Sequence, residues 1–398
     1  MPKGIERLTC LRTLDCFIVC GGGENESKAA NLRELKNLNH IGGSLAITNL
    51  RGGIEDAAEA QLKNKKRLLC LELNFCVNHE DDNLIEVLHP PSDLERLTIF
   101  GYGGKVLPNW MMSLTRLQEL ELYDCTNLEV LPLLGRLPNL ERLILQGLQV
   151  RRLGAGFLGI EEVENDIINE GEIARVITFP KLKRLEILFL GLEEWDGIER
   201  RVGEKDFTIT SIFIMPQLQQ LIIEYCPLLR ALPDYVLAAS LQELRLCDCG
   251  KLEVLPSLGR LPKLESLVLF RVGVRRLDAG FLGIEEVENA NINEGEIARV
   301  TAFPKLETLV ISCLEEIEEW DGIERILVTT TSRFIMPQLQ MLTIYKCPLL
   351  RALPDYVLAA PLQVLDVRAC PYLRKHYGKE KGEDWHKISH IPNIDFRD

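Results

Sequence analysis

The chain has 398 residues with 46% hydrophobic and 26% charged residues, and its formal net charge at pH 7 is −13. A length of this order ordinarily corresponds to two or three domains. An acidic chain without a basic stripe has little with which to neutralise phosphates, so nucleic acid is excluded as the main ligand.

One spacing of leucines recurs along nearly the whole chain. The stretch 117–132 reads L-x-x-L-x-L-x-x-C-x-x-L-x-x-L-P. Leu120 and Leu122 have the period of a short strand with one buried face, whereas Leu128 and Leu131 are spaced as in a loose helical turn. One strand and one turn cannot bury their own leucines, so the unit needs copies on both sides, as in a leucine-rich repeat solenoid.

Copies of this unit follow one another along the chain. Their first leucines are Leu68, Leu94, Leu117, Leu140, Leu182, Leu218, Leu241, Leu264, Leu306, Leu339 and Leu362. The commonest spacing is 23 residues, and the intervals of 33, 36 and 42 residues are units that carry insertions. We therefore expect one elongated α/β solenoid, a curved horseshoe with a parallel β-sheet on its concave face and irregular turns and short helices on its convex face.

The repeats differ in strength along the chain. Residues 1–66 carry weak repeats and a predicted linker helix at 54–66, and residues 67–370 form the solenoid. Within it, the block 117–240 is duplicated at 241–361. The last segment, 371–398, breaks the pattern and is predicted to cap the final repeat through Trp385, Ile388, Ile391 and Ile394.

The cysteines, histidines and glycines point to structure and not to a reactive site. Six cysteines follow the last strand leucine by three residues, where they face inward as small spacers: Cys76, Cys125, Cys226, Cys249, Cys347 and Cys370. The glycines at 21–23 lack the lysine of a phosphate loop, and the histidines of the tail lack a cysteine at ligand spacing. We expect no disulfide framework, catalytic residue, cofactor or metal, and, without a signal segment or a membrane-spanning run, a cytoplasmic protein.

The duplication compares two copies within one chain. All sixteen inward positions that can be paired between the copies are identical, but only one of twelve outward strand positions agrees, Glu119 with Glu243. Drift of an unconstrained surface would explain this, yet the polar segment 156–165 is unchanged at 280–289. Change is concentrated on the outward strand positions, which line the predicted concave face, and this favours a recognition surface that has been altered to contact something new.

The outward strand positions mix charges of both signs with aromatic and aliphatic side chains. Such a surface suits a protein partner better than a polyanion or a small molecule. The predicted protein-binding residues are Arg96, Phe100, Glu119, Glu121, Tyr123, Arg142, Gln146, Arg184, Glu224, Arg245, Phe270, Tyr345, Asp366 and Arg368. The acidic insertions 161–172 and 285–296 are either solvated loops or an acidic rim for a basic partner.

Several motifs resemble one protein family along essentially the whole chain. They are PKGIERLTCLRTL at 2–14, LKNLNHIGGSLAI at 35–47, CPLLRALPDYV at 226–236 and GEDWHKISHIPNI at 382–394. The chain resembles the C-terminal leucine-rich repeat region of plant coiled-coil, nucleotide-binding, leucine-rich-repeat disease-resistance proteins.

The resemblance implies a cytoplasmic immune receptor of plant defence. Its repeat region would recognise a pathogen effector or a guarded host protein and restrain the nucleotide-binding module until then. It also implies that repeats near Arg96 and Glu119 face that module and that repeats near Phe270 and Tyr345 face the effector. Nucleotide binding is not implied, because no residue here matches those motifs. The alternatives are a truncated stand-alone decoy or regulator and a substrate adaptor; an enzyme is not expected.

Overall fold

The computed structural model describes residues 3–19, 30–76, 84–160, 175–196, 211–235, 240–284, 300–320, 333–379 and 382–397. The chain divides into two compact units. Unit 1 comprises Met1–Leu192 and Ile198–Pro216, and unit 2 comprises Glu193–Gly197 and Gln217–Asp398. Each unit is a stack of leucine-rich repeats with a parallel sheet, and the acidic insertions 161–172 and 285–296 lie outside the described residues.

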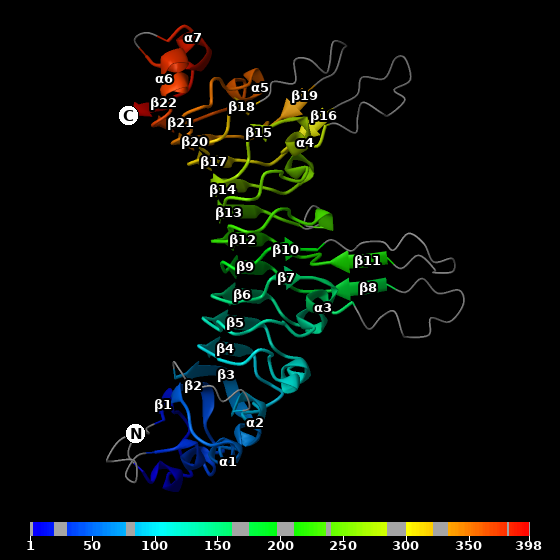
Figure 1. The fold of residues 1–398 in the computed structure, drawn as a ribbon, viewed down its shortest axis with the longest axis vertical. Helices are drawn as coiled ribbons and strands as arrows, with labels where there is room; N and C mark the ends of the chain where they lie inside the picture. Colours follow the sequence, from blue (N-terminus) through cyan, green and yellow to red (C-terminus); the bar gives the residue numbers. More distant parts are fainter. Residues whose placement is uncertain are drawn as a thin grey trace, which may run out of the picture. The chain divides into compact units, whose positions relative to one another are not determined.

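The sheet of unit 1 contains seven parallel strands that follow one another in chain order (Figure 1). They are β1 (Cys16–Ile18), β2 (Gly42–Leu50), β3 (Arg67–Phe75), β4 (Arg96–Phe100), β5 (Glu119–Tyr123), β6 (Arg142–Gln146) and β9 (Arg184–Leu188). Each repeat thus contributes one strand, as the leucine spacing predicts.

The sheet of unit 2 also has seven parallel strands in chain order. They are β12 (Gln220–Glu224), β13 (Glu243–Cys249), β14 (Ser266–Val272), β17 (Thr308–Ser312), β20 (Met341–Tyr345), β21 (Val364–Arg368) and β22 (Asn393–Arg397). Equivalent residues of neighbouring repeats stand opposite each other, for example Glu243, Ser266, Thr308 and Met341. Because the register is straight, side chains 23 to 42 residues apart in sequence form continuous rows.

The remaining elements are short and connect the strands. Unit 1 contains helices α1 (Ile54–Glu59), α2 (Leu84–Val87) and α3 (Ala155–Leu158), and unit 2 contains α4 (Ala279–Leu282), α5 (Asp355–Leu358), α6 (Pro371–Tyr377) and α7 (Trp385–Ile388). The two-residue strands are β7 (Arg152–Leu153), β10 (Glu194–Trp195), β15 (Arg276–Leu277) and β18 (Glu319–Trp320). Two further parallel ribbons pair β8 (Arg175–Thr178) with β11 (Ser211–Ile214) and β16 (Val300–Ala302) with β19 (Arg333–Ile335).

The alternating burial of the sheet strands follows from the pleat of a strand, which points successive side chains to opposite faces. In β5, Leu120 and Leu122 have no exposed surface, whereas the residues before, between and after them are half-buried. The same alternation recurs in β13, where Leu244 and Leu246 are buried. Leucines from adjacent repeats pack on one another and form a continuous core on the inner side of each sheet.

Many strands carry a residue in the left-handed conformation at or just after their last residues. Unit 2 shows this at Tyr225, Asp248, Arg271, Cys313, Lys346 and Ala369, with φ between 49° and 55°. The amide of this residue continues the ladder, as when Cys313 N donates to Tyr345 O at 2.7 Å. The turn is costly for a residue with a side chain, but it sets Arg271 and Lys346 directly beside the ends of β14 and β20.

The inward cysteines behave as predicted. Five of the six are buried, and four of these thiols lie near carbonyls of the preceding repeat, for example Cys249 Sγ at 3.9 Å from Ile223 O. Burial raises the pKa of the Cys249 thiol to about 12, so it stays protonated and weakly reactive. The eleven cysteines among the described residues are free thiols.

The predicted helix at 54–66 is wrong in its length. α1 ends at Glu59, and a separate 3-10 helix covers Leu62–Asn64. Lys65 then turns inward, is completely buried, and donates from Nζ to Leu35 O at 2.7 Å. Lysines on either side of Lys65 in the sequence are exposed, but the chain turn after Asn64 directs the Lys65 side chain into the stack.

The C-terminal segment packs against the last repeats and also extends the sheet. Ile388 and Ile391 are buried, as expected of a cap, while Trp385 and Ile394 are half-buried. The Tyr377 hydroxyl lies 3.2 Å from Leu353 N, which donates to it. β22 pairs with β21 in register, so the tail contributes a strand that the broken leucine pattern does not indicate.

Candidate protein-binding face

The outward strand residues form three rows along each sheet, and we call this surface the outer sheet face. In unit 1 the rows are Cys70, Arg96, Glu119, Arg142, Arg184; Glu72, Thr98, Glu121, Ile144, Glu186; and Asn74, Phe100, Tyr123, Gln146, Leu188. In unit 2 the rows begin at Gln220, Ile222 and Glu224 and continue strand by strand to Val364, Asp366 and Arg368.

All fourteen residues predicted from the sequence lie at outward positions of these strands. Eight are on the outer sheet face of unit 1: Arg96, Phe100, Glu119, Glu121, Tyr123, Arg142, Gln146 and Arg184. Six are on that of unit 2: Glu224, Arg245, Phe270, Tyr345, Asp366 and Arg368. Each is exposed or half-buried, because the row alternates with a row of buried leucines and isoleucines.

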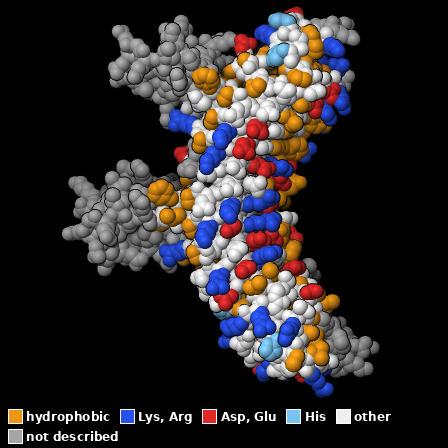
Figure 2. All heavy atoms as spheres, turned by 180° about the vertical axis from the view of Figure 1, so that it is seen from behind, with side chains coloured by type: hydrophobic (Ala, Val, Ile, Leu, Met, Phe, Trp, Pro, Cys, Tyr) orange, Lys and Arg blue, Asp and Glu red, His pale blue; other side chains and the backbone are white. Residues whose placement is uncertain are grey.

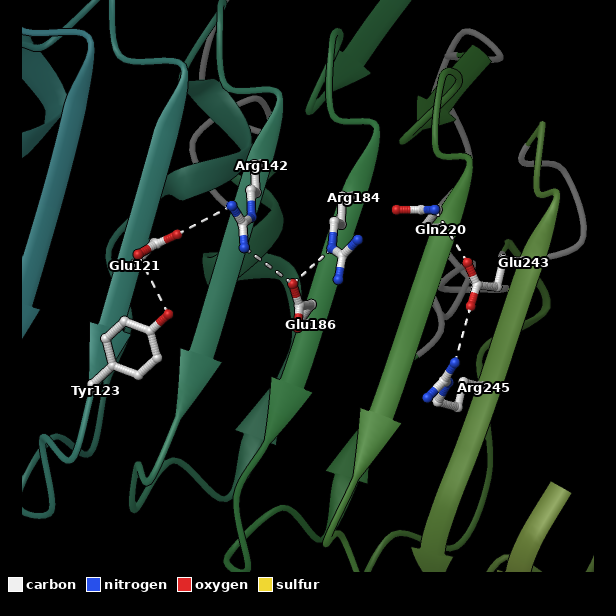
Figure 3. A network of polar contacts seen from close by, with 8 residues as sticks. All are labelled: Glu121, Tyr123, Arg142, Arg184, Glu186, Gln220, Glu243 and Arg245. Atoms are coloured by element: carbon white, nitrogen blue, oxygen red, sulfur yellow. Dashed lines mark hydrogen bonds and ion pairs between the residues drawn. The ribbon is translucent and has the colours of Figure 1, made fainter. Parts of the chain in front are cut away.

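The charged residues of unit 1 neutralise one another across the strands (Figure 3). Arg142 Nη1 lies 3.5 Å from Glu121 Oε1, and Arg142 Nη2 lies 3.6 Å from Glu186 Oε1. Arg184 Nε donates to the same Glu186 oxygen at 2.7 Å. Glu186 is therefore shared by two arginines, and residues of three repeats form one network of alternating charge.

The charged network surrounds an outward apolar side chain that is buried. Ile144 stands between Glu121 and Glu186 in the second row, and Arg142 reaches both carboxylates from the strand that carries Ile144. Although Ile144 points outward, it is only 4% exposed. This low exposure is what the stems of long charged side chains on both sides produce when they pack over an aliphatic neighbour.

Two aromatic residues stack on adjacent strands of unit 1. The ring centroids of Phe100 and Tyr123 are 4.6 Å apart with an interplanar angle of 15°. The Tyr123 hydroxyl donates to Glu121 Oε2 at 3.3 Å, which ties the ring to the charged network (Figure 3). Burial, followed by the Glu121 carboxylate, raises the pKa of Tyr123, so the phenol remains a neutral donor.

The charges of unit 2 lie at the two sides of its outer sheet face. On one side Glu243 accepts from Gln220 Nε2 at 3.1 Å and pairs with Arg245 Nη2 at 3.4 Å (Figure 3). On the other side Arg368 donates to both oxygens of Asp366, at 2.8 and 2.7 Å. Each group is close to neutral as a whole.

The three strands between these groups carry no charge in any of the three outward rows. They are β14, β17 and β20, and their nine outward residues, which we call the uncharged window, are Ser266, Val268, Phe270, Thr308, Val310, Ser312, Met341, Thr343 and Tyr345. Val268 and Val310 are half-buried and Met341 is 41% exposed. The first row of the window has no arginine, because Ser266 stands at the position that corresponds to Arg142.

Two cations flank the aromatic residues of this window. The Arg271 guanidinium carbon lies 5.0 Å from the Phe270 ring centroid, and Lys346 Nζ lies 5.2 Å from that of Tyr345, both within cation–π range. Arg271 also pairs with Asp248 at 3.3 Å. Lys346 has no acidic partner among the described residues.

The sequence-based site omitted Glu186, Glu243, Arg271 and Lys346. Glu186 and Glu243 occupy outward positions that the two-residue period marks, but their central place in the networks depends on the neighbouring repeats. Arg271 is the second-last residue of β14 and Lys346 directly follows β20; both adopt the left-handed conformation, and each lies against the ring of the residue before it. That conformation has no simple signature in the sequence, because six different residue types adopt it in unit 2.

The described surface carries side chains of both charges next to hydrophobic side chains. Blue and red side chains lie next to each other in the middle of Figure 2, with orange side chains beside them, so the charges are interspersed. Within the described ranges, no three histidine, cysteine, aspartate or glutamate side chains are grouped as metal ligands. None of the helices described is both long and apolar enough to cross a membrane.

Known proteins match this chain along most of its length. The family described as R13L1/DRL21 LRRs matches residues 32–148 and 150–272. RGA4 of Solanum bulbocastanum, whose name describes it as a disease resistance protein, is 30% identical to this chain over 99% of this chain and 38% of its own length. RGA1 of the same species, also described by its name as a disease resistance protein, is 34% identical over 57% of this chain and 21% of its own length.

A disease resistance protein of the same plant, RGA2, is 32% identical over 60% of this chain and 23% of its own length. The chain therefore spans well under half the length of these relatives. The family match covers more than half of the chain and includes strands of both units. The chain belongs to the R13L1/DRL21 family of leucine-rich repeats and is a leucine-rich repeat region of the plant disease-resistance type.

Proposed function

We propose that this chain is a non-catalytic recognition module of plant defence in the cytoplasm. It binds a protein, either a pathogen effector or a guarded host protein, through the outer sheet face. In a receptor with a nucleotide-binding module, the repeats of unit 1 restrain that module until the partner binds. The family and the disease-resistance names of its relatives support the defence role.

The observation that carries the proposal is a coordinated replacement on the outer sheet face. Arg142, Arg184 and Glu186 form one network in the first copy, and all three become uncharged in the second, as Ser266, Thr308 and Val310. Removing Glu186 alone would leave Arg142 and Arg184 without their shared acid, so loss of this residue before the arginines would have a cost. Joint replacement over an unchanged core fits selection for a different partner surface.

The proposal that unit 1 restrains a nucleotide-binding module rests on the charge network of its outer sheet face. The outer sheet face of unit 1 keeps its charges but neutralises them internally, with Glu186 shared between two arginines. Preorganised charges of both signs favour orientation and specificity over raw affinity. Such a surface suits a contact that holds a neighbouring module in one orientation and can be released.

The chain itself supplies matched variants that test both parts. One variant places the first copy's charges on unit 2, Ser266→Arg with Thr308→Arg and Val310→Glu. Its reciprocal removes them from unit 1, Arg142→Ser with Arg184→Thr and Glu186→Val. Both should fold, because the inward residues of the two copies are identical.

The assay has two readouts. A panel of pathogen effectors is screened for binding to the wild-type chain and to both variants, and the chain is expressed in leaves with an autoactive coiled-coil and nucleotide-binding fragment. We expect the unit 2 variant to lose effector binding and the unit 1 variant to lose suppression of cell death. A bound effector that is insensitive to both variants would refute recognition through the outer sheet face. Unchanged suppression by the unit 1 variant would refute the restraint role.

A further inference from the structure

The third row of unit 2 contains two aromatic rings separated by a small residue. Phe270, Ser312 and Tyr345 stand opposite one another on β14, β17 and β20. Ser312 is only 6% exposed, whereas both aromatic residues are half-buried, so the smallest side chain of this part of the row stands between two larger ones. Cys313, the next residue, is also small and buried, at 9% exposure.

The same row of unit 1 shows how rings arrange themselves on neighbouring strands. Phe100 and Tyr123 are one strand apart, and their rings stack almost in parallel at 4.6 Å. Phe270 and Tyr345 are two strands apart, which corresponds to about 9.6 Å between their backbones. A planar group above Ser312 would therefore lie about one strand spacing, roughly 4.8 Å, from each ring, within the range of aromatic stacking.

The surroundings of this position select the kind of planar group. The uncharged window offers Val268, Val310 and Thr343 as apolar contacts in the adjacent row. Arg271 and Lys346 already lie against the two rings, and Lys346 has no acidic partner among the described residues. The positive charges of Arg271 and Lys346 disfavour an arginine of the partner at this position. Lys346 favours instead a partner with a neutral aromatic ring and a carboxylate beside it.

The Tyr345 hydroxyl is also available to a partner. Its counterpart by row, Tyr123, is tied to Glu121, but Tyr345 shares its strand with Thr343 and has no hydrogen bond to another described side chain. We infer that Phe270 and Tyr345 clamp an aromatic side chain of a protein partner above Ser312, and that an acidic residue adjoining it in the partner pairs with Lys346. This inference rests on the proposed recognition function and specifies the chemistry of the partner.

Filling the position from within tests the clamp directly. Ser312→Phe places a ring between Phe270 and Tyr345, as Phe100 and Tyr123 already allow on adjacent strands. The matched control is Leu188→Phe, because Leu188 occupies the corresponding position in the first copy. A second variant, Phe270→Leu with Tyr345→Leu, keeps apolar side chains but removes the stacking planes.

The probe is a phage library of random dodecapeptides selected on the full-length wild-type chain. We expect enriched peptides to carry an aromatic residue next to aspartate or glutamate. They should bind Ser312→Phe and the double leucine variant at least about tenfold more weakly, as expected when an anchor residue of an interface is lost. Binding to Leu188→Phe should equal that of the wild type, and Lys346→Glu should weaken binding of the acidic peptides.

Three outcomes would overturn the clamp. They are no enrichment, enriched peptides without an aromatic residue, and peptides that bind Ser312→Phe and the double leucine variant as tightly as the wild type. Folding of each variant is checked by its thermal unfolding midpoint. If Ser312→Phe does not fold, binding to the double leucine variant decides the test. Peptides that bind Ser312→Phe as tightly as wild type but no longer bind the unit 2 charge variant would refute the clamp. They would still support recognition through the outer sheet face of unit 2.

Discussion

Arg142 on β6 pairs with Glu186 on β9 at 3.6 Å, and their counterparts in the second copy, Ser266 and Val310, lack ionisable groups. The pair belongs to a network in which Arg184 shares the same carboxylate. The buried leucines beneath both arrangements are identical. The scaffold thus carries either a neutralised charge network or an uncharged window without change to its core.

This relationship predicts a non-additive effect on stability. Glu186→Val alone leaves Arg142 and Arg184 without their shared acid, and we expect a loss of about 1 kcal/mol, since the arginines are partly solvent-exposed. Replacing all three residues by those of the second copy should cost less, within about 0.5 kcal/mol of wild type. Urea unfolding followed by circular dichroism measures both. A triple variant less stable than Glu186→Val would contradict the network.

Lys65 predicts a dependence of stability on alkaline pH. Burial lowers the pKa of Lys65 from 10.5 to about 8 in the folded protein. Between these values the unfolded chain binds a proton that the native chain does not, so the free energy of unfolding rises with pH. Below pH 8 both states are protonated, and the native state carries the cost of the buried ammonium, about 3 kcal/mol for this shift.

The measurement is urea unfolding of wild type, Lys65→Met and the exposed neighbour control Lys66→Met at pH 7, 8, 9 and 10. We expect Lys65→Met to lose the rise attributable to this lysine, whereas Lys66→Met should retain it. Comparison with the control removes the contribution of other groups that titrate in this range. Parallel pH profiles for Lys65→Met and wild type would show that the ammonium is not buried in solution.

Replacing Gly259 by alanine is predicted to destabilise the fold, because the backbone of Leu282 leaves no room for a Cβ atom. A Cβ at this position would lie 2.3 Å from Leu282 O, and the equivalent Gly135 in the first copy would approach Leu158 O at 2.1 Å. Because the obstacle is backbone, Gly259→Ala should cost about 1 to 3 kcal/mol. Gly250→Ala is the control, since nothing lies within 4 Å of its Cβ, and it should change stability by at most about 0.5 kcal/mol. Equal unfolding midpoints for the two variants would refute this close approach.

Tyr377 is predicted to hold the C-terminal segment on the last repeats. Its buried hydroxyl accepts from Leu353 N at 3.2 Å, so Tyr377→Phe leaves a buried amide without its partner. We expect a loss of about 1 to 3 kcal/mol and faster hydrogen exchange of the Leu353 amide. The control is Tyr372→Phe, because Tyr372 is 46% exposed. Unchanged exchange at Leu353 would mean that this hydrogen bond does not protect the amide.

Parts of the fold follow directly from residue spacing. The period of two around Leu120 and Leu122 predicts which side chains enter the core, and all fourteen predicted site residues indeed lie at outward strand positions. The inward cysteines are equally predictable, since they occupy one position of the repeat. These features depend on local geometry, which the sequence expresses within a single unit.

Other features were missed because they depend on contacts between repeats or on backbone turns. The helix predicted at 54–66 ends at Glu59, and the buried Lys65 has no local signal in its charged surroundings. Strand β22 lacks the leucine pattern and forms because β21 offers it a hydrogen-bonding edge. The role of Glu186 likewise becomes visible only when Arg142 of the neighbouring repeat and Arg184 are seen to share its carboxylate.

The sequence alone determined the repeat, its 23-residue unit, the duplicated block and the division into inward and outward residues. Those properties arise from the alternation of side chains along a strand, which each repeat expresses by itself. The tertiary structure decided which outward residues meet: Arg142 pairs with Glu186, and Ser312 stands between Phe270 and Tyr345. Such neighbours come from different repeats, and only the hydrogen-bonded register of parallel strands brings them within contact distance.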